Sequence, residues 1–314
     1  MNEAGFPKHF DGKRFYNPDA PQAAGFWDVL RWKLSSRPEK SPRFIADVEQ
    51  SIPPQRVEGS ELRVTLVNHS TVLLQQLGMN ILTDPIWSER TSPVAWAGPK
   101  RRRQPGVVWE NLPPIDIVLL SHNHYDHMDL PTLRRLASRG DSTFVVPVGC
   151  AALLRSEKIG PVNELDWGER LGLKGCTIHS VPAFHFSNRW LHDRNKTLWC
   201  GYVTECQERV VYFAGDTAFG PHFEQIREKF GRPRLALLPI GAYLPRWFMS
   251  PVHMGPDDAV RVHQILGAET SIAIHHGTFQ LADDGVDTPR RELIAVARDN
   301  RFLALNNGQF VDIP

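Results

Sequence analysis

Four side chains that can bind a metal ion lie within six residues in the segment SHNHYDHMD. They are His122, His124, Asp126 and His127, and they follow an apolar run that ends at Leu120. Buried imidazoles and carboxylates must be paired or coordinated, because leaving them desolvated without partners costs free energy. Imidazole nitrogen and carboxylate oxygen suit Zn²⁺, and histidine-rich sites with an open position are typically catalytic. The segment therefore predicts a catalytic metal site, and the alternative is a solvated histidine-rich loop.

Three more candidate ligands each come just after an apolar run. His185 lies in VPAFHF, Asp216 in VVYFAGDT and His275 in SIAIHHGTF. Open α/β sheets gather their ligands beyond the carboxyl ends of strands, so we expect these residues to meet the first four. Two-metal hydrolases hold ions about 3.5 to 4 Å apart. We expect two sites with Asp216 bridging them: His122, His124 and His185 in one, and Asp126, His127 and His275 in the other.

The elements that must position these ligands begin at residue 62, where short apolar runs end in turn residues. The runs predict nine strands, namely LRVTLV, VLLQQL, NILTDP, IDIVLLS, TFVVPV, CTIHSVP, VVYFAGD, LALLPIG and SIAIHHG. Apolar stripes and end signals predict helices at residues 130–139 and 256–266. Strands that alternate with helices favour a layered α/β sandwich, with helices outside and two sheets facing each other.

Residues 1–60 differ in texture, because Pro-rich and charged segments interrupt any regular element. We expect an irregular arm at 1–60 that packs on one domain at 61–314. Within the arm, GFWDVLRWKL predicts a short amphipathic helix. Its expected stripe holds Phe26, Val29, Leu30, Lys33 and Leu34, and Trp27 and Trp32 lie off it. We expect the helix to pack on the domain; contact with a membrane surface is the alternative.

Composition limits the partners and the location. The chain of 314 residues has 36 Lys and Arg against 35 Asp and Glu, a net charge of +1, which provides no broad basic field for nucleic acid. The start lacks the apolar core of a secretory signal, and no run is long enough to span a membrane. We therefore expect a cytoplasmic protein. Its four cysteines, Cys150, Cys176, Cys200 and Cys206, contain no Cys-x-x-Cys pair and are expected to be reduced and buried.

The segment SHNHYDH resembles the His-x-His-x-Asp-His signature of the metallo-β-lactamase superfamily. FAGDT, PIGAYLPRWFM and AIHHGTF resemble segments of its N-acylphosphatidylethanolamine phospholipase D family, and HFDGKRFYNP is similar to bacterial members. The resemblance runs from about residue 60 to the end. It implies a four-layer αββα sandwich and a dinuclear zinc site on the seven residues assigned above. Fe or Mn is an alternative, because metal availability often overrides affinity.

The resemblance implies hydrolysis of N-acylphosphatidylethanolamine to N-acylethanolamine and phosphatidic acid. We expect a hydroxide between the zincs, oriented by Asp126 as the catalytic residue, to attack phosphorus. The alternatives on the same fold are a lactonase or esterase and a small-molecule phosphodiesterase. A di-iron oxidoreductase is disfavoured, because related redox members carry glutamate where this chain has His124. A non-catalytic protein should have lost ligands, and none is missing.

Several further residues are expected near the site. His253 is expected either to contact a substrate phosphate or to cap the following helix. Tyr243 and Trp247 are further candidate substrate contacts, and Trp247 with Trp190 either forms an apolar mouth or lies in the core. His276 is expected behind the ligands or at the surface, and His69 to be structural. The basic run KRRR at residues 100–103 either meets anionic head groups, which would give peripheral membrane contact, or is a solvated loop.

Overall fold

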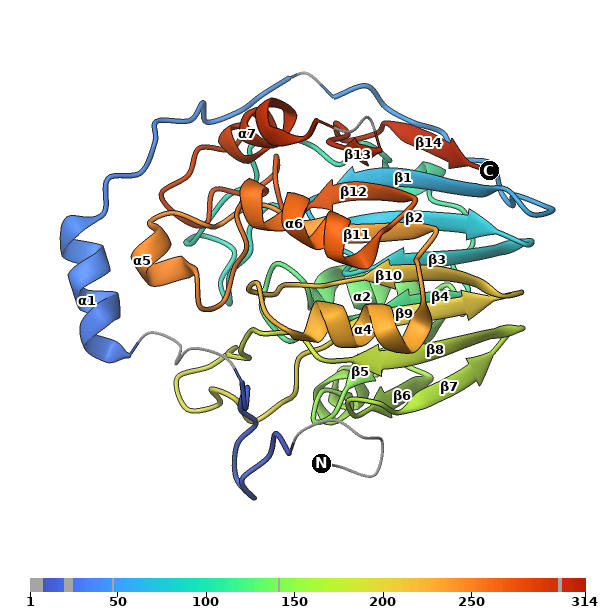
Figure 1. Ribbon diagram of the computed structural model, residues 1–314, viewed down its shortest axis with the longest axis horizontal. Coiled ribbons are helices and arrows are strands. Elements are labelled where there is room, and N and C mark those ends of the chain that lie inside the picture. Colours follow the sequence, from blue (N-terminus) through green and yellow to red (C-terminus); the bar gives the residue numbers. More distant parts are fainter. Residues whose placement is uncertain (1–7, 20–24, 47, 141, 299–300) are drawn as a thin grey trace.

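The computed structural model describes residues 8–19, 25–46, 48–140, 142–298 and 301–314. Parts of the expected arm, residues 1–7, 20–24 and 47, lie outside the described residues. Two seven-stranded sheets lie face to face (Figure 1). In spatial order the first sheet contains β14 (Phe310–Ile313), β1 (Leu62–Asn68), β2 (Thr71–Gln76), β3 (Met79–Thr83), β4 (Ile117–Leu119), β5 (Thr143–Pro147) and β6 (Val162–Leu165). The second contains β13 (Phe302–Leu303), β12 (Thr270–Ile274), β11 (Leu235–Pro239), β10 (Arg209–Phe213), β9 (Gly201–Cys206), β8 (Cys176–Val181) and β7 (Arg170–Leu173).

Helices cover the outer faces of both sheets. Leu66 and Leu237 belong to the core between the sheets, whereas Leu133 packs with Val118 on the outer face of the first sheet. The predicted four-layer αββα sandwich is therefore confirmed. The first sheet is covered by α2 (Leu130–Ala137) and α3 (Ala151–Ser156), and the second by α4 (His222–Phe230), α6 (Pro256–Leu266) and α7 (Thr288–Val296). The remaining helices are α1 (Phe26–Ser35), the short η1 (Trp109–Asn111) and α5 (Arg246–Met249).

Each sheet changes from antiparallel to parallel pairing. The first pairs β1, β2 and β3 antiparallel and then β3 to β6 parallel. The second pairs β7 to β10 antiparallel and then β10 to β13 parallel. Parallel neighbours bring their carboxyl ends to one edge, where ligands gather in open α/β sheets.

All nine predicted strands are present, and the helix predicted at 256–266 has those bounds. It ends at Gly267, whose φ of 59° is the left-handed conformation typical of a helix end. The strands that the prediction missed are β6, β7, β9, β13 and β14. Most of them are short or half exposed, so they lack a strong apolar run; β13 has only two residues.

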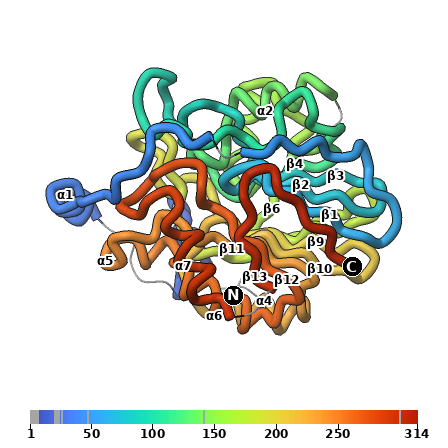
Figure 2. The backbone as a smooth tube through the Cα atoms, turned by 90° about the horizontal axis from the view of Figure 1, so that it is seen from above, coloured from blue at the N-terminus to red at the C-terminus, as the bar shows by residue number. Residues whose placement is uncertain are grey.

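The arm runs along the outside of the sandwich before it enters β1 (Figure 2). Its predicted helix is confirmed as α1, but the prediction of which face of α1 packs on the domain is wrong. Leu34 of the expected stripe is 81% exposed, whereas Trp32 stacks on Phe248 of α5 with 4.9 Å between ring centroids. Trp32 Nε1 also donates to Asp283 Oδ1 at 3.1 Å. The indole of Trp32 offers both a stacking face and a donor, so Trp32 decides which side of α1 faces the domain.

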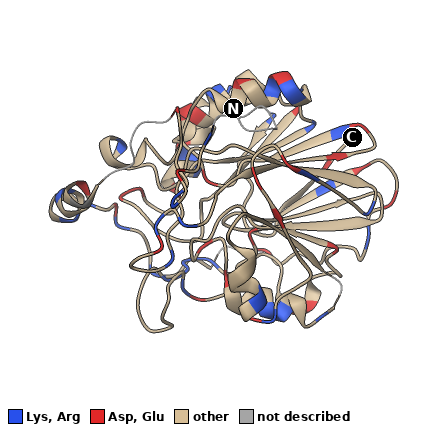
Figure 3. Cartoon of the chain, turned by 90° about the horizontal axis from the view of Figure 1, so that it is seen from below, with Lys and Arg blue, Asp and Glu red and all other residues tan. Residues whose placement is uncertain are grey.

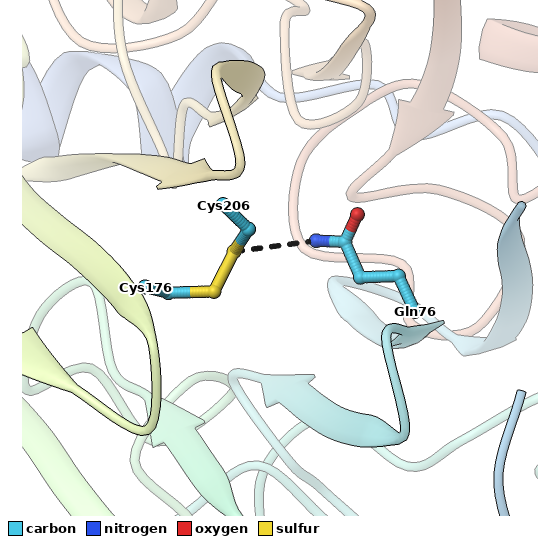
Figure 4. The surroundings of a disulfide bond; sticks show 3 residues. All are labelled: Gln76, Cys176 and Cys206. Carbon is cyan, nitrogen blue, oxygen red and sulfur yellow. Dashed lines mark hydrogen bonds between the residues drawn. A yellow bond between two sulfur atoms is a disulfide. The ribbon is translucent and has the colours of Figure 1, made fainter. Parts of the chain in front are cut away.

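Cys176 and Cys206 form a disulfide between β8 and β9 (Figure 4). The antiparallel register places them opposite each other with Cα atoms 4.4 Å apart, and Gln76 Nε2 donates to Cys206 Sγ at 3.6 Å. The expectation of four reduced thiols is therefore wrong for this pair. Cys150 and Cys200 are free and buried, as expected.

Candidate metal centre

The seven predicted ligands meet at one edge of the sandwich. The loop from Ser121 to Asp129 joins β4 to α2 and carries four of them, and His185, Asp216 and His275 follow β8, β10 and β12. Two glycines make this approach possible. A Cβ at Gly215, next to Asp216, would lie 2.6 Å from Ser121 Cβ, and a Cβ at Gly241 would lie 2.0 Å from the carbonyl oxygen of His275.

The first expected group consists of three imidazoles. His122 Nε2 lies 2.8 Å from His124 Nδ1, and His185 Nε2 lies 3.2 Å from the same atom. The candidate ligand atoms of the three residues lie within 4.8 Å of one another. His185 Nδ1 faces the carbonyl oxygen of Val252 at 2.9 Å, which fixes the ring and turns Nε2 toward the other two histidines.

The second expected group contains Asp126, His127 and His275. The Nε2 atoms of His127 and His275 lie 3.2 and 3.3 Å from Asp126 Oδ2. They lie 3.2 and 3.1 Å from Asp216 Oδ2, and His185 Nε2 of the first group is 3.8 Å from that same oxygen. Asp216 therefore reaches both groups, as a bridging carboxylate must.

The donor set fits divalent cations. His127 Nε2, His275 Nε2 and Asp216 Oδ1 are buried and have no hydrogen-bond partner among the described residues. Burial of unpaired polar atoms is costly, and a coordinated cation would satisfy all three. The sequence-predicted arrangement of three imidazoles beside a mixed His and Asp group is thus chemically suited to two hydrolytic metal ions.

The electrostatics agree with this chemistry. Burial lowers the pKa of His124 to about 4, so the imidazole is neutral and its lone pair can bind a cation. Burial opposes ionisation of Asp126 and Asp216, but the charge of His127 and contacts with His275 lower both pKa values well below the usual range. Burial likewise disfavours the charged form of His275, but Asp216 raises its pKa to about 9. Metal binding at His275 must therefore displace a proton.

Asp84 is a buried residue at this centre that the sequence reasoning missed. Its carboxylate accepts hydrogen bonds from the backbone N–H and hydroxyl of Ser121 at 2.7 and 2.6 Å. Its Oδ2 also lies 2.6 Å from His127 Nδ1, so it orients the ring that faces the two aspartates. Asp84 directly follows β3, much as Asp216 comes soon after β10, and that placement was a usable signal.

His69 lies closer to the centre than its expected structural role implies. Its Nε2 is 3.1 Å from Asp126 Oδ2, and it joins Asp126, His127 and His275 in one group of possible metal ligands. His276 is buried, and its Nε2 lies 3.3 Å from the carbonyl oxygen of Ala273.

The three candidate substrate contacts have different surroundings. His253 Nδ1 lies 3.9 Å from Asp216 Oδ2. The N-cap of α6 is Gly255, so the capping alternative for His253 is wrong. Tyr243 is buried, and its hydroxyl donates to Glu292 Oε2 at 2.5 Å. Trp247 is half exposed on α5, with the guanidinium of Arg31 over its ring at 4.7 Å.

Both expectations for the basic run at 100–103 are wrong for two of its arginines, which are buried. Arg101 donates to the carbonyl oxygens of Ser88 and Ile86 at 3.0 and 3.2 Å. Arg103 donates to the carbonyl oxygen of Gly277 and pairs with Asp287, both at 2.8 Å. These arginines brace the loops around the centre. The remaining Lys and Arg are interspersed with Asp and Glu across the described chain (Figure 3).

Residues 79–276 match the Beta-lactamase superfamily domain. The chain belongs to the metallo-β-lactamase superfamily. It is a metal-dependent hydrolase of that superfamily, and the matched region contains all seven candidate ligands.

Two relatives have informative names. The chain is 41% identical over 233 residues to N-acyl-phosphatidylethanolamine-hydrolyzing phospholipase D 1 of Caenorhabditis elegans. The alignment covers 71% of this chain and 65% of that protein. It is 36% identical over 232 residues to the mitochondrial N-acyl-phosphatidylethanolamine-hydrolyzing phospholipase D of Saccharomyces cerevisiae. That alignment covers 72% of this chain and 49% of the yeast protein. The chain thus spans less than two thirds of either relative.

A solved metallo hydrolase from the archaeon Ignicoccus hospitalis has the same fold. Its TM-score is 0.60 at 21% identity, over 81% of this chain and 99% of that one. Among the described residues, no helix is long and apolar enough to cross a membrane.

Proposed function

We propose that this chain is a dinuclear zinc phosphodiesterase that hydrolyses N-acylphosphatidylethanolamine to N-acylethanolamine and phosphatidic acid. The observation that carries the proposal is the pair of adjoining ligand groups that share Asp216, in a chain 41% identical to a phospholipase of that name. His122, His124 and His185 would hold one zinc, Asp126, His127 and His275 the other, and Asp216 would bridge them.

Two zinc ions bound by these residues would supply Lewis-acid stabilisation of a phosphoryl oxygen and a water whose pKa is about 7. The chain's own groups orient the reaction. The low pKa of Asp126 keeps its carboxylate ionised, and this carboxylate would accept a hydrogen bond from the attacking water and so orient it. The pKa of His253, lowered to about 4 by burial, keeps this imidazole neutral, and it lies beside Asp216, where it can donate to a phosphoryl oxygen.

We further propose that the protein contacts lipid aggregates as a peripheral protein. Trp190 and Leu191 lie in the loop that carries His185, and both are largely exposed. Trp247 on α5 adds a half-exposed indole, and exposed aromatic side chains favour a lipid–water interface.

The test combines metal content with turnover. We expect elemental analysis to give about two zinc ions per chain, and hydrolysis of N-acylphosphatidylethanolamine in mixed micelles to stop when a chelator is added. Two metals without lipid turnover would leave a hydrolase and reject the lipid substrate, so lactones and small phosphodiesters would be assayed next. Less than one metal per chain would reject the dinuclear centre.

A further inference from the structure

Arg189 connects the two loops that carry most of the candidate ligands. It lies four residues after His185, in the segment between β8 and β9. Its Nη1 donates to the carbonyl oxygens of Asn123 and Met128, at 3.1 and 2.9 Å. Those two carbonyls flank His124, Asp126 and His127, so one guanidinium spans the part of the chain that holds three of the seven ligands.

Tyr125 completes the connection from the other side. The guanidinium carbon of Arg189 lies 4.1 Å from the centroid of the Tyr125 ring. The hydroxyl of Tyr125 donates to the carbonyl oxygen of Arg189 at 2.8 Å. Each of the two residues thus contacts the loop that carries the other, and together these contacts fix the distance between the two loops.

The backbone around Arg189 is itself held in place. Asp193 Oδ1 accepts hydrogen bonds from the backbone N–H groups of Arg189 and Trp190, at 2.9 and 2.8 Å. Ser187 accepts from the backbone N–H of Asn195 at 2.8 Å through its carbonyl oxygen. The side chain of Arg189 therefore extends from a fixed backbone. Its hydrogen bonds to Asn123 and Met128 can hold the loop that carries His124, Asp126 and His127 in one position.

We propose that Arg189 is a positioning residue that holds the His124–His127 segment in register with His185, so that both ligand groups are preformed. The inference rests on the proposed metal centre. Groups that orient metal ligands from behind typically contribute about 10- to 100-fold to metal affinity. Lysine should not replace Arg189, because an ammonium lacks the planar guanidinium that stacks on the Tyr125 ring while it donates to the two carbonyls.

The competing interpretation is that Arg189 binds the substrate. It borders a cavity of about 290 Å³ together with Tyr125 and Asp129. A substrate-binding arginine would change KM and leave metal affinity alone, whereas a positioning residue changes metal affinity in the absence of any substrate.

The experiment measures zinc affinity of the full chain by competition with a chromogenic chelator. We expect Arg189→Met and Arg189→Lys each to weaken binding by at least about tenfold, and Tyr125→Phe to weaken it by about fivefold through loss of one hydrogen bond. The matched control is Arg139→Met, which also removes a guanidinium that donates to a backbone carbonyl, that of Leu112 at 3.0 Å, but at the opposite end of α2 from the ligand loop. Melting of the metal-free variants measures any general loss of stability.

Wild-type zinc affinity in Arg189→Met or Arg189→Lys would overturn the inference, as would an increase in KM without a change in zinc affinity. A loss no larger than that of Arg139→Met would overturn it too. Measurements on the wild type test the proposed function independently of the Arg189 variants. If the wild type binds two zinc ions but does not cleave the lipid, the lipid proposal fails and the role of Arg189 stands.

Discussion

At the scale of single residues, His127 is oriented by Asp84, a residue outside the seven predicted ligands. Its Nδ1 meets the carboxylate of Asp84, which is fully buried. In the neutral ring that binds a metal, this contact keeps the proton on Nδ1 and leaves Nε2 toward Asp126 and Asp216. The affinity of the centre should therefore depend on a residue that need not touch the metal.

Asp84→Asn tests this dependence. The amide would present an N–H₂ group to either His127 Nδ1–H or Ser121, and two donors cannot pair. We expect metal affinity to fall by about 10- to 100-fold, measured by chelator competition.

Asp116→Asn is the matched control, because Asp116 is also buried and accepts several hydrogen bonds, from Asn80, Arg56 and Lys174. It lies before β4, at the opposite end of that strand from the ligands. We expect a lower melting temperature with unchanged metal affinity. Equal metal affinities in Asp84→Asn and wild type would contradict the assigned role of Asp84.

Asp216→Ala removes the one carboxylate that reaches both ligand groups. We expect turnover to fall below about 1% of wild type, a loss of more than about 2.7 kcal/mol in transition-state stabilisation, together with loss of metal. Elemental analysis and a steady-state assay on the purified variant measure both. Turnover near the wild-type level in a variant without metal would show that the proposed mechanism is wrong.

The sequence made these seven residues visible for a physical reason. A polar residue that directly follows an apolar run is out of place in packing terms, as in the segments that end at Asp216 and His275. Arg189 gave no such signal, because its hydrogen-bond acceptors are backbone carbonyls, which every residue has. Arg101 and Arg103 were misread for the same reason: a charge run indicates solvent unless carbonyls that are distant in the chain enclose it.

At the scale of elements, apolar runs predicted the nine strands, and stripes with end signals predicted α2 and α6. The orientation of α1 was not predictable from its stripe, because Trp32 packs through a stack and a hydrogen bond to Asp283, both on segments more than 200 residues away in the chain. The disulfide escaped prediction because only the register of β8 and β9 brings its cysteines together.

The disulfide should stabilise the second sheet without affecting the metal centre. A disulfide that closes a loop of this length (sequence separation 30) lowers the conformational entropy of the unfolded chain. In the chain-entropy treatment this stabilises the folded protein by about 3.5 kcal/mol. We expect the double variant Cys176→Ala/Cys206→Ala to unfold at lower denaturant concentration than the oxidised wild type, with unchanged metal affinity.

Dithiothreitol provides the control for that prediction. It should lower the unfolding midpoint of the wild type and leave the double variant unchanged. A wild type that does not respond to dithiothreitol would mean that the two thiols are not joined in solution.

At the scale of the whole molecule, apolar side chains are exposed at the end of the sandwich that holds the ligands. Helices α1 and α5 lie beside each other there (Figure 1), joined by the stack of Trp32 on Phe248. Because Trp32 faces the domain, Trp27 and Leu34 point outward and are 75% and 81% exposed. Arg31 and Lys33 lie on the same helix, so apolar and basic groups are combined, as in helices that bind anionic bilayer surfaces.

This arrangement predicts that α1 contributes to binding lipid surfaces. Burying a large apolar side chain contributes about 1.5 to 3 kcal/mol when it is complete, and partial insertion of two such side chains should still exceed 1.4 kcal/mol, about tenfold in affinity. We expect Trp27→Ser/Leu34→Ser to sediment about tenfold less with anionic phospholipid vesicles.

Ile294→Ser is the control for this prediction, because Ile294 is 57% exposed on α7. Equal binding of the double variant and Ile294→Ser would exclude α1 from the contact, and a wild type that stays in the supernatant would exclude the contact itself. Turnover of a water-soluble phosphodiester should stay unchanged in the double variant, because neither residue belongs to the metal centre.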